Sequence, residues 1–304
     1  MNTAAALCCQ TTRPGKLARR SRWLPAAALC LFLSAASQGA PAEPPAWQGE
    51  LNALRGSDTA IALLPPARAA EAADADRRLG ELFRGLAARY PHEAAVRKAA
   101  GDHFWRVGDA NTAAAEWEAA QDLDPTDAET ADALGNARLR DGRTRLACEQ
   151  FRRAVAARPG LARYHFELGN VLYLFRHQLP GLPDLPDEAA ALRESLAQFR
   201  AARDLASGNA EFARAYAETF YGVPDPDWPE ALKAWQHVRT LSPDEPDFAL
   251  GHLVRVSLRL SQPDEAERYL EMMHDPRYAA TRATLRRLVA DWRQRRASSE
   301  TPVR

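Results

Sequence analysis

Cysteine is scarce in this chain, and its placement restricts how the chain can be stabilised. Only four cysteines occur among 304 residues, and three of them (Cys8, Cys9 and Cys30) lie near the N-terminus. If that segment is removed, only Cys148 is left and an intramolecular disulfide is impossible. The stability of the remaining chain must then come from packing.

The chain also lacks net charge, because its 40 basic and 40 acidic residues cancel. All five charges before Glu43 are positive, so residues 43–304 carry 35 basic and 40 acidic groups, a net charge of −5. A protein that binds nucleic acid along its whole length is expected to be strongly basic. We therefore expect no nucleic-acid partner.

Motifs of catalysis and metal binding are missing as well. The sequence has no Gly-rich nucleotide loop, no Gly-x-Ser-x-Gly and no Cys-x-x-Cys, and its seven histidines are scattered without ligand spacing. Cys148 follows Ala147 and is expected to be a small buried hydrophobe rather than a nucleophile. We predict no catalytic residues, no cofactor and no metal, with an enzyme of unrecognised site as an alternative.

The N-terminal 42 residues have the three-part order of a secretory signal peptide. Positive charges at residues 13–22 precede an apolar run at 23–36, and small residues follow as far as Ala42. The run is shorter than the roughly 20 residues that span a membrane. We predict export to the periplasm or the cell exterior with cleavage near Ala42; an uncleaved anchor or a wrongly assigned start are the alternatives.

A 34-residue period runs through the middle of the chain. The residues that recur at this interval are Pro91, Pro125 and Pro159; Gly101, Gly135 and Gly169; Phe83, Trp117 and Phe151; Ala113 and Ala147; Ala120 and Ala154. Five registers that share one period indicate a repeat protein.

These residues resemble the tetratricopeptide repeat (TPR), which has 34 residues folded as two antiparallel helices. The resemblance implies an all-α, right-handed α-solenoid of helix-turn-helix repeats. It also implies that the glycines permit close approach of paired helices, that the aromatics fill the space between layers, and that the prolines end each second helix.

The pattern divides the chain into five parts. We expect a signal peptide at 1–42, a linker with at most one short helix at 43–70, and a lone second helix at 71–91. A TPR-like solenoid should occupy 92–275, with an insertion at about 176–189 that contains three prolines. Residues 276–304 should form a basic capping helix and tail, with Leu285, Leu288, Val289 and Trp292 on one face.

In TPR proteins the first helices of successive repeats line a concave groove, and the register places exposed residues there. The predicted partner-binding residues are Lys98, Trp105, Arg106, Asn136, Arg140, Arg163, Phe166, Asn170, Tyr173 and Arg214. Asn136 and Asn170 occupy equivalent places, and an amide can donate to a carbonyl while accepting from an N–H, which suits an extended peptide.

These observations predict a non-catalytic protein–protein interaction scaffold of the cell envelope that binds a protein or an extended peptide. An assembly or maturation factor that holds unfolded exported clients, with the insertion as a lid, is the main alternative. Residues 276–304 carry a net charge of +6 and are a possible site of peripheral membrane contact.

Overall fold

The computed structural model describes residues 44–300, with the side chains of residues 44–296. The predicted signal peptide at 1–42 lies outside the described residues, as do residues 301–304. Residues 44–300 form thirteen α-helices and three short 3₁₀ turns, without a β-strand. The helices are α1 (Ala46–Ala62), α2 (Ala69–Arg89), α3 (Ala94–Arg106), α4 (Ala110–Leu123), α5 (Ala128–Arg140), α6 (Thr144–Ala157), α7 (Ala162–Leu174), α8 (Glu188–Leu205), α9 (Ala210–Thr219), α10 (Trp228–Leu241), α11 (Pro246–Arg259), α12 (Pro263–Glu271) and α13 (Ala279–Glu300).

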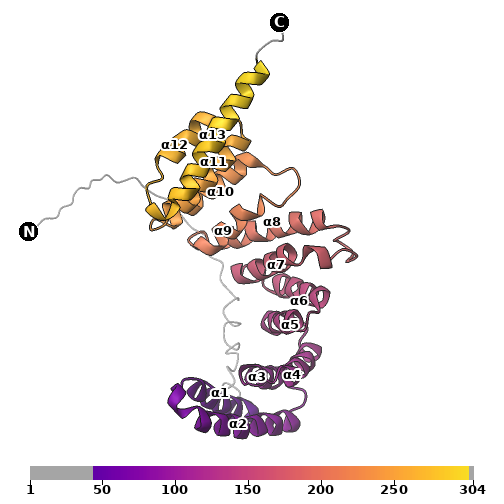
Figure 1. Ribbon diagram of the computed structural model, residues 1–304. Helices are drawn as coiled ribbons and strands as arrows, with labels where there is room; N and C mark the ends of the chain where they lie inside the picture. Colours follow the sequence, from indigo (N-terminus) through magenta and orange to yellow (C-terminus); the bar gives the residue numbers. More distant parts are fainter. Residues whose placement is uncertain (1–43, 301–304) are drawn as a thin grey trace, which may run out of the picture. The chain divides into compact units, whose positions relative to one another are not determined.

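The helices stack in the order of the sequence, and each packs mainly against its neighbours along the chain (Figure 1). The pairs α3–α4, α5–α6 and α7–α8 have the most extensive contacts. The prediction of an all-α solenoid is therefore confirmed. Within the described residues, no helix combines the length and apolarity that crossing a membrane requires.

Glycine allows the paired helices to approach closely, as predicted. A Cβ built on Gly101 of α3 would lie 2.5 Å from the indole ring of Trp117 in α4. At the equivalent glycines of α5 and α7, a Cβ would lie 2.9 and 2.8 Å from a phenyl ring of the second helix. Real side chains do not tolerate such distances, so these three positions require glycine.

The prediction of a linker at residues 43–70 is wrong. Residues 46–62 form α1, which buries Leu51 and packs the half-buried Leu54 and Ile61 against α2 and α3. Since α1 and α2 lie against each other, α2 is the second helix of a complete pair and not a lone helix.

The insertion between α7 and α8 is packed into the protein. Leu179, Leu182 and Leu185 are buried in one cluster with residues of α6, α7 and α8. Arg145 of α6 donates a hydrogen bond to the carbonyl oxygen of Gln178 (3.1 Å). The segment therefore fills a gap in the core, and its buried leucines do not support the interpretation as a lid.

The last helix covers the end of the array. Leu285 and Val289 of α13 are buried and Trp292 is half-buried, whereas Leu288, predicted on the same face, is 38% exposed. Leu288 lies one residue before Val289, which turns it about 100° away from the contact. Arg293 forms ion pairs of 2.6 and 2.8 Å with two acidic side chains of α12.

Candidate functional site

The first helices of five successive pairs are α3, α5, α7, α9 and α11. Four of them carry three positions spaced by four and three residues, which therefore lie on one side of the helix, and in α9 the third position falls in the turn after the helix. We call these positions the first-helix face. They are Lys98, Asp102 and Trp105 in α3; Asp132, Asn136 and Leu139 in α5; Phe166, Asn170 and Tyr173 in α7; Arg214 and Glu218 in α9 with Tyr221 in the turn that follows it; Phe248, His252 and Arg255 in α11.

The cations around the α3 and α5 part of this face have acidic partners within the protein. Lys98 forms ion pairs with Asp127 (3.4 Å) and Glu129. Burial by itself would lower the pKa of Lys98, but these carboxylates more than compensate and hold the pKa above its usual value. Arg163, at the start of α7, lies 3.1 Å from Asp132 of α5. Lys98 and Arg163, two of the predicted partner-binding residues, are therefore already ion-paired within the protein.

Trp105 and Arg140 contact each other across α3 and α5. The guanidinium carbon of Arg140 lies 5.3 Å from the centre of the Trp105 ring, within the range of a cation–π interaction. The Trp105 ring also lies 5.5 Å from the ring of Trp117, so this side chain is half-buried. The Arg140 side chain is exposed.

The two predicted asparagines differ in their surroundings. Asn136 is exposed, and its Nδ2 donates to the carbonyl oxygen of Asp132 on its own helix (2.9 Å). Asn170 is half-buried, and its side chain has no hydrogen-bond partner among the residues that the structure describes. The side-chain amide of Asn170 therefore has more capacity than that of Asn136 to form a new hydrogen bond.

The face becomes aromatic from α7 onward. Phe166 lies 4.6 Å from Phe212 of α9, measured between ring centres, and 5.7 Å from Phe199 of α8. Phe166 and Phe212 are half-buried, as is Tyr173 at the end of α7. Each of these rings offers apolar area without being fully used in the core.

Arg214 and Phe248 continue this surface on α9 and α11. The Arg214 guanidinium lies 4.2 Å from the centre of the Phe248 ring and donates to Glu218 at 2.8 Å. Both Arg214 and Phe248 line a cavity of about 250 Å³.

A second aromatic group surrounds His252. Its ring is stacked on Trp235 at 3.9 Å, and its Nδ1 lies 3.0 Å from the hydroxyl of Tyr221. Burial, and then the positive charges of Arg255 and Arg214, lower the pKa of His252 to about 4. Burial raises the pKa of Tyr221 to about 12, so this hydrogen bond joins a neutral hydroxyl to the imidazole of His252.

Arg106 lies apart from the first-helix face, in contact with the first helix pair. Its Nη2 is 2.5 Å from a carboxylate oxygen of Asp58 in α1 and 2.5 Å from one of Asp76 in α2. Burial would raise the pKa of Asp58, but hydrogen bonds from Arg106 and from His103 (2.6 Å) hold it below its usual value.

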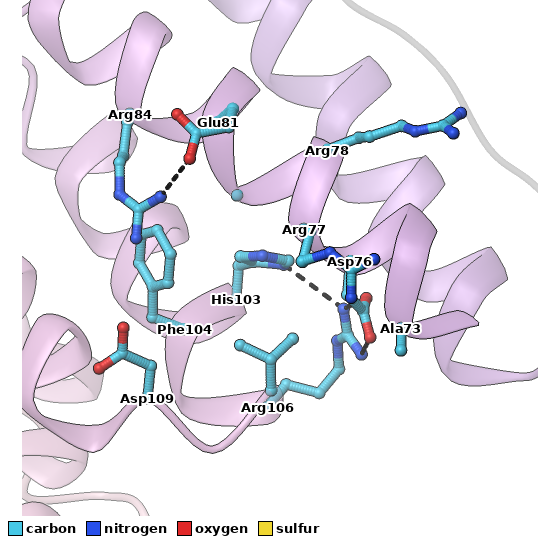
Figure 2. Close-up of a pocket in the computed structure, with 12 residues that line it drawn as sticks. Ala73, Asp76, Arg77, Arg78, Glu81, Arg84, His103, Phe104, Arg106 and Asp109 are labelled. Atoms are coloured by element: carbon cyan, nitrogen blue, oxygen red, sulfur yellow. Dashed lines mark hydrogen bonds and ion pairs between the residues drawn. The ribbon is translucent and has the colours of Figure 1, made fainter. Parts of the chain in front are cut away.

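This cluster borders a cavity of about 780 Å³ between α2 and α3 (Figure 2). Asp58, Asp76 and His103 bring one ligand atom each within 4.8 Å of one another, which is a spacing that metal sites use. However, the guanidinium of Arg106 already bridges the two carboxylates. The arrangement therefore suits a structural ion-pair network that ties α3 to α1 and α2.

Comparison with solved structures identifies the fold. A crystal structure of YrrB, described as a TPR protein with an unusual peptide-binding site, matches 71% of this chain and 99% of its own, with 15% identity and a TM-score of 0.52. The chain has the TPR fold. MamA (16% identity, 69% of this chain and 97% of its own) and PilF of Pseudomonas aeruginosa (14%, 74% and 91%) match with TM-scores of 0.46 and 0.47. No protein-family model and no curated protein sequence matches the chain.

The TPR register shows which residues the sequence interpretation missed. Phe248, His252 and Arg255 of α11 occupy the same places as predicted residues in α3, α5 and α7. A Leu-Gly dipeptide marks these places in three first helices, as Leu134-Gly135, Leu168-Gly169 and Leu250-Gly251. Leu250-Gly251 was the sequence signal that could have placed these three residues, because it sets the register of α11.

Cys148 has no features of a nucleophile. It is fully buried in α6, and burial raises the pKa of its thiol to about 11. Since the thiolate is the reactive form, this cysteine is inert at neutral pH. It serves the TPR fold as a small core residue, as predicted.

Proposed function

We propose that the chain is a non-catalytic scaffold for protein–protein contacts, and that its first-helix face holds a partner polypeptide in extended form. The observation that carries this proposal is the series of half-buried and exposed aromatic side chains on that face from α7 to α11. Large rings at partly exposed positions are typical of interface anchors. The peptide-binding site described for YrrB, which has the same fold, supports the proposal.

The place of action that we propose is the cell envelope. Its support is the order of charge, apolar run and small residues in positions 1–42. Sequencing the N-terminus of protein recovered from the periplasm should give Glu43 as the first residue. Recovery of a chain that begins at Met1 would contradict export by a cleaved signal.

The binding proposal is tested in two stages. Crosslinking in the native envelope should first capture a partner at defined stoichiometry, whereas a holder of unfolded clients would capture several different polypeptides. The double variant Asn136→Ala and Asn170→Ala should then bind that partner roughly five-fold to a hundred-fold more weakly, since each lost hydrogen bond costs about 0.5–1.5 kcal/mol. Asn111→Ala, an exposed change on α4, is the matched control.

We also propose that α13 makes a peripheral contact with an anionic membrane surface. Arg286 and Arg287 are exposed and form no ion pair within residues 44–296, and Leu288 beside them is exposed. An arginine near an anionic surface contributes about 1 kcal/mol, so the double variant Arg286→Gln and Arg287→Gln should bind anionic vesicles roughly thirty-fold more weakly. Equal binding by both proteins would contradict the contact.

A further inference from the structure

Two arginines of α11 lie at the end of the first-helix face. Arg255 and Arg259 lie one helical turn apart on α11, and neither forms an ion pair within the described side chains. Arg255 donates only to a carbonyl of its own helix (3.2 Å). In contrast, Lys98 and Arg214 on the same face are each held by a carboxylate.

Aromatic rings lie directly beside these arginines. The Arg259 guanidinium is 5.5 Å from the ring centre of Trp228, the first residue of α10. That ring lies 5.9 Å from the ring of Tyr221, which is 41% exposed. A guanidinium that lies over a ring keeps its edge N–H groups free to donate. We call Tyr221, Trp228, Arg255 and Arg259 the arginine–aromatic patch.

Arg255 and Arg259 bring positive charge to this patch. Arg255 contributes to the low pKa of His252, and both Arg255 and Arg259 oppose the effect of burial on the pKa of Tyr221. Unmatched guanidinium groups bind carboxylates through paired N–H donors, and arginine clusters recognise acidic peptide motifs. The neighbouring rings suit an apolar side chain of the same peptide.

We propose that the arginine–aromatic patch receives an acidic segment of the partner polypeptide. An Asp or Glu carboxylate binds Arg255 and Arg259, and an adjacent apolar or aromatic side chain packs on Tyr221 and Trp228. This inference rests on the proposed function, because it specifies the chemistry of the polypeptide that the first-helix face binds.

A random peptide library displayed on phage, selected on the purified protein, tests the inference without knowledge of the natural partner. Enriched peptides should combine Asp or Glu with a large apolar residue. The double variant Arg255→Gln and Arg259→Gln should bind them about ten-fold more weakly or worse, as expected for lost charge-assisted hydrogen bonds. Arg78→Gln with Arg193→Gln removes the same charge from exposed positions of α2 and α8 and should leave peptide affinity unchanged.

Charge reversal separates recognition from a structural role. The double variant Arg255→Glu and Arg259→Glu should lose the acidic peptides and bind versions in which each Asp or Glu is replaced by Lys. Circular dichroism checks that every variant keeps the wild-type helicity. A structural role alone would give no such rescue and would overturn the inference.

The remaining outcomes are also distinct. If the selected peptides are basic or neutral, or if they respond only to Asn136→Ala and Asn170→Ala, the arginine–aromatic patch is not the recognition site and the proposed groove function stands. If no peptide is enriched, both proposals fail. Binding of phosphatidylglycerol vesicles that depends on Arg255 and Arg259, without peptide enrichment, would assign the patch to lipid headgroups and overturn the inference.

Discussion

The two ends of the first-helix face are built from the same repeat but carry different chemistry. On α3 and α5 the face is charged, and cations such as Lys98 are bound to nearby carboxylates. From α7 to α11 it is aromatic, and Arg255 has no acidic partner within the described residues. A matched charge is already solvated by the protein, so a ligand gains little from it. For the binding that we propose, the difference predicts that most of the binding energy is gained toward the C-terminal end.

Packing differs along the chain in the same way. The glycines of α3, α5 and α7 lie against aromatic rings, whereas a Cβ on Gly251 of α11 would meet Leu285 at 3.6 Å, an ordinary contact. The early pairs are therefore intolerant of added volume. The last pair is covered by α13 and can accommodate an added methyl group at Gly251.

The largest expected effect tests this packing difference. Gly101→Ala should lower the free energy of unfolding by about 2–3 kcal/mol, because its Cβ would overlap the Trp117 ring. Gly251→Ala should instead leave it unchanged or raise it by about 0.5–1 kcal/mol, because alanine favours the helix. Denaturant titrations of both variants measure the contrast. Equal losses at the two sites would show that the repeats are packed alike.

The second prediction compares two ion pairs. Arg106→Met should cost about 1–2 kcal/mol, since it leaves the half-buried carboxylate of Asp76 unpaired and that of Asp58 with His103 alone. Arg77→Met, in an ion pair with Asp74 in which both side chains are exposed, should cost less than about 1 kcal/mol. Thermal unfolding of both variants measures the difference.

The pH dependence of the first variant follows from Asp58. Its folded-state pKa is below the usual value, so its contribution to stability is present above about pH 4 and is lost as the pH falls further. The deficit of Arg106→Met should therefore shrink in acid. A deficit that stays constant down to pH 2 would contradict the role assigned to this network.

The third prediction concerns binding along the face. Tyr173→Ala with Tyr221→Ala removes two rings from equivalent places at the end of α7 and in the turn after α9, and should weaken binding of a selected peptide about ten-fold or more. Lys98→Met, which removes an ion-paired cation, should change the affinity less than about two-fold. If Lys98→Met weakened binding more than the tyrosine double variant in the same titration, the binding energy would lie at the N-terminal end.

Much of the fold follows from the sequence because glycine, aromatic residues and proline each have a steric role at fixed spacing. The failure at residues 43–70 has a physical explanation as well. Pro45 immediately precedes α1, and Pro65 and Pro66 follow it, so the prolines mark the ends of a helix and not an extended linker. The prolines can be read directly from the sequence, whereas the burial of Leu51 against α2 depends on tertiary contacts.

The first-helix face was predictable in position but not in chemistry. Register places Lys98 and Arg163 on exposed sides of their helices, yet it does not show that carboxylates from a neighbouring repeat hold both cations. Asp58, one of the two carboxylate partners of Arg106, was hidden because α1 was not expected to be a full helix. Charge pairing between repeats depends on side-chain reach across the stack, which a single period does not specify.

The last prediction sharpens the comparison through pH. His252 is neutral in the folded protein because burial, and then Arg255 and Arg214, lower its pKa from 6.5 to about 4. The unfolded chain takes up a proton at higher pH than the folded one, so this histidine stabilises the fold fully above about pH 6.5 and progressively less as the pH falls toward 4. His252→Gln keeps a polar side chain and removes the titration. Between pH 7 and pH 4.5, the wild-type protein should lose more stability in denaturant titrations than this variant does. His237→Gln, a half-buried change on α10 outside the stacked group, is the control and should lose as much as the wild type. If His252→Gln and the wild type lose stability in parallel, the histidine is hydrated in solution and the aromatic end of the face is more open than its stacked rings indicate.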